Sequence, residues 1–458
     1  MTSRYGSGWI FALGVALIPA SIVGCGDAFN AGPIDYEPSE RLSIELKDKP
    51  ILRKGIADTL AKMFGPAPRE IVVPAGSGLP EGGRRLGRFE KIGDDLKPVV
   101  GPGSDGKDEE LAGGYGLYRK YCLHCHGIQG AGDGPTAEFL YPRPRDYRPG
   151  VFKFTSVNPS NPKASRADLR KTLVKGLDGT SMPAFEALMT GSEIEQVIDY
   201  VIFLSMRGEV EKLLIDEAKT ADGDDIAALS PETVQELAEN VFGNWKSAEE
   251  QVVSPSARRS PPSPESIARG RDIFLGVNTT GNKAACTDCH GLHAAGDGAS
   301  FVDKKIFDKV VFRRKPIEEA ISERYKEVVD ETRAAHHAAG ESATAEAAPI
   351  EPFESYKERV MTAWKPGSID DWGNPLRPAN LNLGIYKGGQ RPIDLYWRLA
   401  KGINGAKMPA HASLLPDDQI WDVVNFILAL PYDPGLLKDA EALKRRAASP
   451  ASAAAATP

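Results

Sequence analysis

The sequence predicts a mainly α-helical protein made of two copies of one module, with a long helical insertion in the second copy. Three observations predict this fold class. The pattern C-x-x-C-H occurs at 122–126 and again at 286–290. Other short motifs recur downstream in the same order, and apolar residues near the end of each copy have helical spacing. The chain is therefore a duplication rather than a series of unrelated domains.

The composition is that of an ordinary globular chain without a basic surplus. Of its 458 residues, 41% are hydrophobic and 26% are charged, which argues against a polytopic membrane protein and against a disordered one. The 56 basic and 63 acidic residues give a formal net charge of -7. A phosphate backbone would find little positive charge here, so we expect no nucleic-acid partner. Five cysteines are too few for a disulfide-built scaffold.

The first 24 residues are predicted to be an export signal. Residues 9–23 are uncharged and mostly apolar, and this run is shorter than the roughly 20 residues of a membrane-spanning helix. The small residues before Cys25 resemble the processing box of bacterial lipoproteins, which predicts a lipid anchor on Cys25. A plain export signal and an uncleaved anchor are the alternatives. Each places the chain outside the cytoplasm, and we expect it on the periplasmic side of the bacterial inner membrane.

Each C-x-x-C-H motif has the attachment spacing of a c-type haem. Two cysteines three positions apart lie on one side of a helical turn, where their sulfurs can bond both vinyl groups of one haem. The histidine that follows is then directed at the iron as the proximal ligand. The predicted residues are Cys122, Cys125 and His126 in the first copy and Cys286, Cys289 and His290 in the second.

Two other chemistries use a bare C-x-x-C pair, namely a zinc site and a thioredoxin-like redox pair. Neither accounts for a histidine directly after each second cysteine. Neither accounts for the surrounding repeat, in which Gly132-Asp133-Gly134 recurs 164 residues later. The segment that ends in Met182-Pro183-Ala184 recurs as Met408-Pro409-Ala410 at an offset of 226, and the same offset continues into the following apolar residues.

The repeat predicts the helical core of each copy. Apolar residues at helical spacing indicate a last helix at about 191–207 and at about 416–430. The first helix of each copy has a glycine and an aromatic residue four positions apart, so that two helix backbones can cross closely and the aromatic ring can pack against the last helix. These pairs are Gly114 with Tyr118, expected against Tyr200, and Gly270 with Phe274, expected against Phe426.

With these features, each copy resembles a class I cytochrome c domain. The first copy also contains Gly-Asp-Gly-Pro followed by Arg-Pro-Arg-Asp-Tyr-Arg-Pro-Gly, which is similar to cytochrome subunits that accompany alternative complex III and haem-copper oxidases. The resemblance implies two covalently bound haem c groups. It also implies a methionine as the sixth iron ligand, on a loop before the last helix. Met182 and Met408 occupy that position, each before a proline that keeps the loop out of a helix interior.

Several further residues have predicted roles. Met189 and Met206 are expected to be packing residues. Arg145 and Arg377, with Arg143, are candidates to bind haem propionates, because a planar guanidinium suits a carboxylate; a solvated loop charge is the alternative. The remaining histidines are expected to be solvated, although one of them lies three residues after Met408 and is a conceivable substitute ligand. These histidines are His293, His336, His337 and His411, and His124 is expected to point away from the iron.

The predicted domain order follows from the repeat. It is a signal peptide at 1–24, a tether or extended segment at 25–106 with one helix near 54–64, a first cytochrome c domain at 107–215, a linker at 216–264 with a short acidic helix, a second domain at 265–435 and a disordered tail at 436–458. The insertion spans about 303–372 and has alternating charges, and it contains an apolar stripe at helical spacing, formed by Ile317, Ile321, Tyr325, Val328 and Val329. It is expected to form one or two surface helices, with a flexible link at 336–352. These helices would either cover the module or form a docking surface.

The sequence therefore predicts an electron-transfer protein rather than an enzyme. Histidine with methionine gives a six-coordinate iron with no free position for a substrate. The expected partners are redox proteins, namely a terminal oxidase together with alternative complex III or a dehydrogenase. Two alternatives stay open. One is a dihaem cytochrome c peroxidase, which needs a sixth position that can open. The other is a fixed cytochrome subunit of a membrane dehydrogenase or oxidase complex.

Overall fold

The computed structural model describes most of the chain from residue 36 onward. The predicted signal and Cys25 lie outside the described residues. No helix in the described part of the chain has both the length and the apolar character needed to cross a membrane. The described ranges are 36–68, 70–83, 85–87, 89–92, 95–98, 101–102, 108–109, 113–277, 286–339, 349–367 and 369–448.

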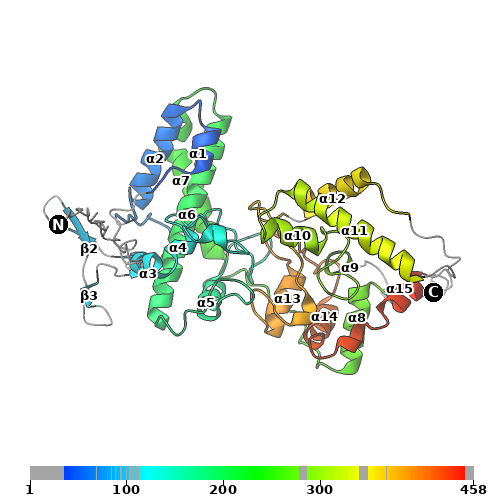
Figure 1. Ribbon diagram of the computed structural model, residues 1–458. Helices are drawn as coiled ribbons and strands as arrows, with labels where there is room; N and C mark the ends of the chain where they lie inside the picture. The colour runs from blue at the N-terminus through cyan, green and yellow to red at the C-terminus, as the bar shows by residue number, and fades with distance from the viewer. Residues whose placement is uncertain are drawn as a thin grey trace, which may run out of the picture. The chain divides into compact units, whose positions relative to one another are not determined.

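The structure is mainly helical, as predicted (Figure 1). Within the described residues, paired strands occur only as two short antiparallel hairpins that precede the first copy of the repeat. They are β1 (Phe89–Ile92) with β2 (Asp95–Pro98), and β3 (Gly101–Pro102) with β4 (Asp108–Glu109). We call the described residues 113–215 the first module and residues 264–448 the second module.

The first module is built on a close crossing of α3 (Gly113–Tyr121) and α6 (Gly191–Thr220). A Cβ atom added at Gly114 would lie 2.2 Å from the backbone oxygen of Gln196, so only glycine allows the two backbones this near. The ring of Tyr118 packs 5.2 Å from that of Tyr200. The predicted glycine and aromatic lock is confirmed here, and it fixes the start of the C-x-x-C-H segment that follows α3.

The second module repeats this crossing with α8 (Pro264–Leu275) and α14 (Asp417–Ala429). A Cβ atom added at Gly270 would lie 2.0 Å from the backbone oxygen of Asp422, and Phe274 packs 5.4 Å from Phe426. Helix α14 has nearly the predicted bounds. In contrast, α6 continues thirteen residues beyond its predicted end at 207 and ends at Thr220. The reason is that buried apolar residues continue along it through Val210, Leu214 and Ile215.

Two helical segments outside the repeat cover the extended part of α6 (Figure 1). The sequence predicts a tether at 25–106 with one helix near 54–64. The structure confirms that helix as the fifteen-residue α2 (Pro50–Phe64) and adds α1 (Glu40–Glu45) before it. Leu52, Ile56, Leu60 and Phe64 recur every four residues and are buried, and Phe64 packs edge-on against Phe203 of α6. This apolar stripe is why the segment is a packed hairpin rather than an extended chain.

The predicted linker at 216–264 also differs from the structure. Helix α7 (Pro231–Ser247) lies within it and buries Val241, Phe242 and Trp245 against the first module. The Trp245 indole donates a hydrogen bond to Glu209 of α6 at 2.8 Å. The linker along the chain is therefore limited to the residues between α7 and α8. It packs on α14, where the Trp421 indole donates a hydrogen bond to the carbonyl of Ala257. Although the segment is rich in charged residues, its apolar residues lie on one face of α7, so the helix packs on the first module instead of forming a linker.

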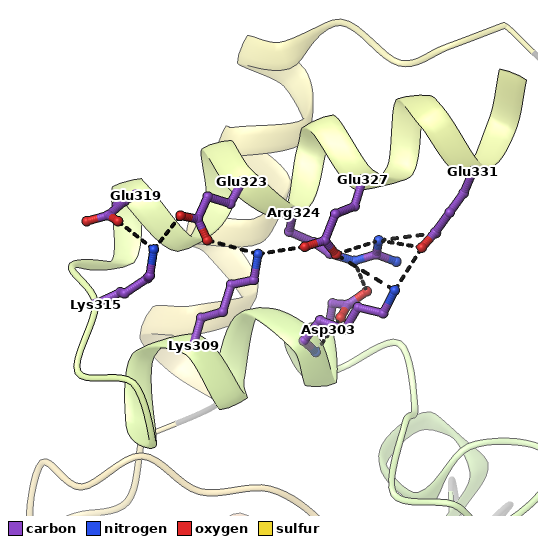
Figure 2. A network of polar contacts seen from close by, with 9 residues as sticks. Asp303, Lys309, Lys315, Glu319, Glu323, Arg324, Glu327 and Glu331 are labelled. Atoms are coloured by element: carbon purple, nitrogen blue, oxygen red, sulfur yellow. Dashed lines mark hydrogen bonds and ion pairs between the residues drawn. The ribbon is translucent and has the colours of Figure 1, made fainter.

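The insertion forms three helices, α10 (Lys304–Val311), α11 (Ile317–Ala339) and α12 (Phe353–Gly367), which pack together (Figure 1). Ile321 of the predicted apolar stripe is fully buried in their common core. Salt bridges join α10 to α11, with Lys309 between Glu323 and Glu327 (Figure 2). The start of the predicted flexible link at 336–352 is instead helical, because α11 continues to Ala339, and residues 340–348 lie outside the described chain.

The predicted disordered tail begins as a folded segment. A 3-10 turn at Pro434–Leu437 and α15 (Ala440–Ala448) follow α14, and Leu437 and Ala440 are buried against the second module. Lys444 donates a hydrogen bond to Thr287, between the cysteines of the second C-x-x-C-H motif, at 2.7 Å. Apolar burial therefore extends this module past residue 435, and residues 449–458 lie outside the described chain.

Candidate haem-binding site

A single large cavity is lined by both modules. Its volume is about 1160 Å³, beyond the roughly 300–1,000 Å³ of most single-ligand pockets. Its walls combine both C-x-x-C-H motifs, both methionine loops and residues of the insertion. All ten predicted haem-site residues line it, namely Cys122, Cys125, His126, Met182, Arg145, Cys286, Cys289, His290, Met408 and Arg377.

The first C-x-x-C-H motif forms the short helix α4 (Leu123–His126) directly after α3. The imidazole of His126 lies 3.1 Å through Nδ1 from the backbone oxygen of Arg145. A carbonyl oxygen can only accept, so Nδ1 carries the proton and Nε2 keeps its lone pair. Burial lowers the pKa of His126 to about 4, although the Arg145 carbonyl opposes this. A neutral imidazole with a free Nε2 is the form that binds a metal.

The second motif reproduces this arrangement on α9 (Cys286–His290). Nδ1 of His290 lies 3.1 Å from the backbone oxygen of Ala379, the position that corresponds to Arg145 at an offset of 234. Burial lowers the pKa of His290, with the Ala379 carbonyl acting in the opposite direction. The glycines of both Gly-Asp-Gly turns then fold back on the motifs, since Gly132 and Gly296 donate to the carbonyls of His126 and His290 at 2.9 and 2.8 Å.

The four cysteines of the C-x-x-C-H motifs form no disulfide, and all four line the cavity. Burial raises the pKa of Cys122 to about 12 and that of Cys286 to about 12. A thioredoxin-like pair requires the opposite shift, because the thiolate is the reactive form. Among the described residues, no group of three or more His, Cys, Asp or Glu side chains is arranged to hold a metal ion. The raised pKa of both thiols therefore argues against a thioredoxin-like pair.

The two methionine loops have matching backbones. The carbonyl of Met182 accepts a hydrogen bond from Leu177 N at 3.1 Å, and that of Met408 accepts from Ile403 N at 3.1 Å. A Cβ atom added at Gly176 would lie 2.7 Å from the Met182 carbonyl, and glycine tolerates its φ of 67°. Both methionines line the cavity that the histidines also line. Met189 and Met206 are buried in the apolar core, which confirms their predicted packing role.

The two predicted propionate arginines are placed differently. Arg145 stacks on Trp372 with its guanidinium 3.7 Å from the ring centroid and lies 3.8 Å from Asp370. Arg377 donates through Nη2 to the carbonyl of Gly296 at 2.7 Å, and its buried Nε has no hydrogen-bond partner among the described residues. Burial lowers the pKa of both groups, to about 10 for Arg145. Neither is a solvated loop charge, whereas Arg143 is exposed.

The other histidines divide into two groups. His293, His336 and His337 are exposed, as predicted, and His124 is exposed as well, although it also lines the cavity. The expectation that His411 is solvated is wrong, because it is 6% exposed and lines the cavity. It occupies the position of Phe185 at an offset of 226, and its backbone N–H donates to Leu399 at 2.9 Å, as Phe185 donates to Leu173. Burial lowers the pKa of His411, against nearby carbonyls, and its Nδ1 has no partner at hydrogen-bonding distance within the described chain.

Sequence reasoning missed the residues that join the two modules. Asp370 and Trp372, at the end of the insertion, contact Lys153 and Asp146 of the first module. A second set of contacts is related to the repeat, since Lys171 pairs with Asp394 at 3.0 Å and Lys401 donates to Thr155 at 2.8 Å. An aspartate followed by a tryptophan within a polar insertion is the one signal that could have marked this turn.

The residues fit a bound haem c in each module. Each half of the cavity offers two thiols, a neutral histidine with its outer nitrogen bonded, a methionine on a fixed loop and a buried arginine. The unpartnered Nε of Arg377 is a buried donor of the kind that a propionate satisfies. The ligand roles of these ten residues stay predictions.

Comparison with known proteins supports a cytochrome c domain in the first module. Residues 109–201 match the family model described as cytochrome C oxidase, cbb3-type, subunit III. This segment is similar to a cytochrome c domain, and its bounds contain Cys122, Cys125, His126 and Met182. No curated protein matches the chain.

One solved structure with similarity to the chain belongs to a reducing HAO-like protein complex of Kuenenia stuttgartiensis. The identity is 20%, the match covers 69% of this chain and 93% of the other, and the TM-score is 0.40. A cytochrome c domain implies covalently bound haem c and a role in haem electron transfer.

Proposed function

We propose that this chain is a dihaem c-type cytochrome that transfers single electrons between membrane respiratory complexes. The observation that carries the proposal is the repetition of one haem-site geometry in two modules that line one cavity. When bound, each haem c supplies a one-electron ferric and ferrous couple.

The protein's own residues would hold each haem in a fixed frame. Cys122 and Cys125 would each form one thioether bond, and His126 would donate Nε2 to the iron while Nδ1 stays bonded to the Arg145 carbonyl. Met182 would be the second protein ligand of the iron. The second module would use Cys286, Cys289, His290 and Met408 in the same roles. Because these ligands come from segments fixed by backbone hydrogen bonds, they would keep each haem in place with little rearrangement of the protein.

The shared cavity supports transfer between the two sites within one chain. Hydrogen bonds and ion pairs between the modules hold their cavity-lining segments against each other, from Lys153 with Asp370 to Lys401 with Thr155. An electron received at one module would then leave from the other without release of a carrier. The matching hydrogen bonds to the carbonyls of Met182 and Met408 support the same methionine role in both modules, and this favours an electron-transfer protein over a dihaem peroxidase.

We further propose a location and partners for this activity. A lipid on Cys25 would anchor the chain on the periplasmic side of the bacterial inner membrane, and the two modules would be kept near their partners. A terminal oxidase is the proposed electron acceptor, and alternative complex III or a dehydrogenase is the proposed donor. A fixed place in such a complex is the variant of this proposal that isolation from native membranes would identify.

Two measurements on the haem-loaded full chain test the proposed function. Intact mass should give the polypeptide plus two haems, and replacement of Cys122 and Cys125 by serine should remove one of them. The visible spectrum of the reduced protein should stay unchanged when carbon monoxide is added, because both sixth positions are filled. One haem or none contradicts the dihaem proposal, and a carbon monoxide adduct in the unmodified protein favours a peroxidase.

A further inference from the structure

We infer that the turn at 370–372 of the second module positions the proximal histidine of the first module and lowers the reduction potential there. The inference rests on the proposed function, because a potential is defined only with haem c bound. It makes the two sites dependent on each other, although each module contains its own predicted ligands.

Trp372 holds the peptide that orients His126. Its Nε1 donates to the backbone oxygen of Asp146 at 3.0 Å, and its ring lies under the guanidinium of Arg145, 3.7 Å from the centroid. The carbonyl between these two contacts, that of Arg145, is the acceptor for Nδ1 of His126 at 3.1 Å. The Trp372 indole of the second module therefore contacts Arg145, which carries the acceptor, and the next residue, Asp146. The orientation of the His126 imidazole depends on these two contacts.

Asp370 places a buried negative charge beside the same site. Its side chain is 3% exposed and lies 2.8 Å from Lys153 and 3.8 Å from Arg145, both of the first module. Backbone N–H groups of Trp372 and Asn374 donate to its other oxygen at 3.0 and 2.8 Å, so the carboxylate is fixed. Asp370, Arg145 and Lys153 all line the haem cavity. A negative charge in a buried site favours the more positive ferric state, which lowers the potential.

At the position equivalent to Arg145, the second module has an alanine. Ala379 supplies the carbonyl that accepts from His290, and a methyl group can neither stack on an indole nor pair with a carboxylate. The proposed effect is therefore specific to the first site. This asymmetry gives the inference its test.

The test compares Asp370→Asn with Asp371→Asn in the haem-loaded full chain. Asp371 is the adjacent residue, its side chain is 67% exposed, and it lies 3.6 Å from Lys407, so its replacement makes the same charge change outside the cavity. We expect Asp370→Asn to raise the equilibrium constant for reduction of the first site at least tenfold, which raises its potential by about 59 mV for one electron. Asp371→Asn should change the same equilibrium constant less than threefold. Spectroelectrochemical titration measures both.

A second variant separates positioning from charge. Trp372→Phe keeps a ring under Arg145 and removes the hydrogen bond to Asp146, and we expect a two- to tenfold change at the first site and a smaller one at the second. It also carries the test if Asp370→Asn does not fold. Assignment of the two waves comes from the same variants made with Cys286 and Cys289 replaced by serine. In that background, only the first module can attach haem.

Each outcome has one meaning. If Asp370→Asn and Asp371→Asn shift the first potential equally, or if the shift falls on the second site, the inference is wrong while the proposed function stands. If the unmodified chain carries fewer than two haems, the proposed function fails first. Near-ultraviolet circular dichroism of each variant identifies a loss of folding, which would move both waves together.

Discussion

In the first module the last helix runs for 30 residues and is covered by α1, α2 and α7, whereas the last helix of the second module ends after 13 residues. The second module instead has the three-helix insertion, whose Phe307 and Phe312 pack on Tyr141 of the first module. The frame around the predicted ligands is nevertheless the same. Both histidine to carbonyl distances are 3.1 Å, and so are both hydrogen bonds to the methionine carbonyls.

This difference shows where a duplicated module can vary. The ligand frame is held by backbone hydrogen bonds and by glycines at close approaches, which leave little room for substitution. The side chains around this frame differ between the two modules. Phe185 of the first module corresponds to His411 of the second, and Arg145 corresponds to Ala379. We therefore expect the two sites to share a coordination and to differ in potential and in their response to mutation.

The largest expected effect is on the sixth coordination position. Met182→Ala should open the first site, so that the reduced protein forms a carbon monoxide adduct at one haem. Met408→Ala should form much less of this carbon monoxide adduct. His411 lines the cavity with an unpartnered Nδ1 and can replace the methionine as an iron ligand, whereas Phe185, its counterpart in the first module, cannot. Carbon monoxide difference spectra of the two variants measure this contrast.

The matched control for that contrast is the double variant Met408→Ala with His411→Phe, which gives the second site the residue of the first. It should bind carbon monoxide as fully as Met182→Ala. Equal binding by the two single variants would show that His411 does not reach the iron. The buried histidine would then be a packing residue only.

The next effect is on stability at the helix crossings. Valine at Gly114 or Gly270 would place Cβ at 2.2 or 2.0 Å from a backbone oxygen, so the crossing must open, at a cost of about 3 kcal/mol or more. Gly243 of α7 is the matched control, because no atom lies within 4 Å of its added Cβ. Gly243→Val should stay within about 0.5 kcal/mol of the original protein. Urea denaturation measures all three, and equal losses would contradict the close crossing.

The sequence predicts the repeated parts of this fold and of the site better than the parts outside the repeat. Positions such as Gly114 and Met182 recur with their context, so two copies of one pattern support each assignment. The segments 40–64 and 231–247 have no counterpart in the second module. Their apolar stripes are interrupted by many charged residues, and their packing against α6 is seen only in the structure. Asp370 and Trp372 could not be predicted as site residues, because their role depends on how two modules pack.

A smaller effect concerns two lysines at equivalent positions. Lys175 of the first module is exposed and pairs with Glu186, whereas Lys401 is 4% exposed at the contact with Thr155. Burial lowers the pKa of Lys401 to about 8, and Asp168 opposes the shift. Because a lysine of the unfolded chain titrates near pH 10.4, the unfolded state binds more protons between about pH 8 and 10.4. The contribution of Lys401 to stability therefore rises with pH across that window.

Replacement of each lysine by methionine checks this reasoning. The difference in unfolding free energy between Lys401→Met and the original protein should change by about 1–3 kcal/mol from pH 7 to pH 10.5, with the variant favoured most at pH 7. Lys175→Met is the matched control, because it removes the exposed lysine at the equivalent position. Urea denaturation at several pH values gives both, and parallel curves for the two variants would show that Lys401 titrates like an exposed lysine.

The smallest effect is expected in the salt bridges that join α10 to α11 (Figure 2). Hydrogen bonds from Lys315 and Lys309 lower the pKa of Glu323 to about 2, yet its side chain is 35% exposed, so solvent and ions screen its interactions. Glu323→Gln should lower the melting temperature slightly at low ionic strength and not at all in about 1 M salt, where the screening length is only about 3 Å. Because this network lies away from the haem cavity, both reduction potentials should stay unchanged, in contrast to the buried Asp370. A loss of stability that persists in high salt would mean that the insertion depends on this network as the modules depend on their buried contacts.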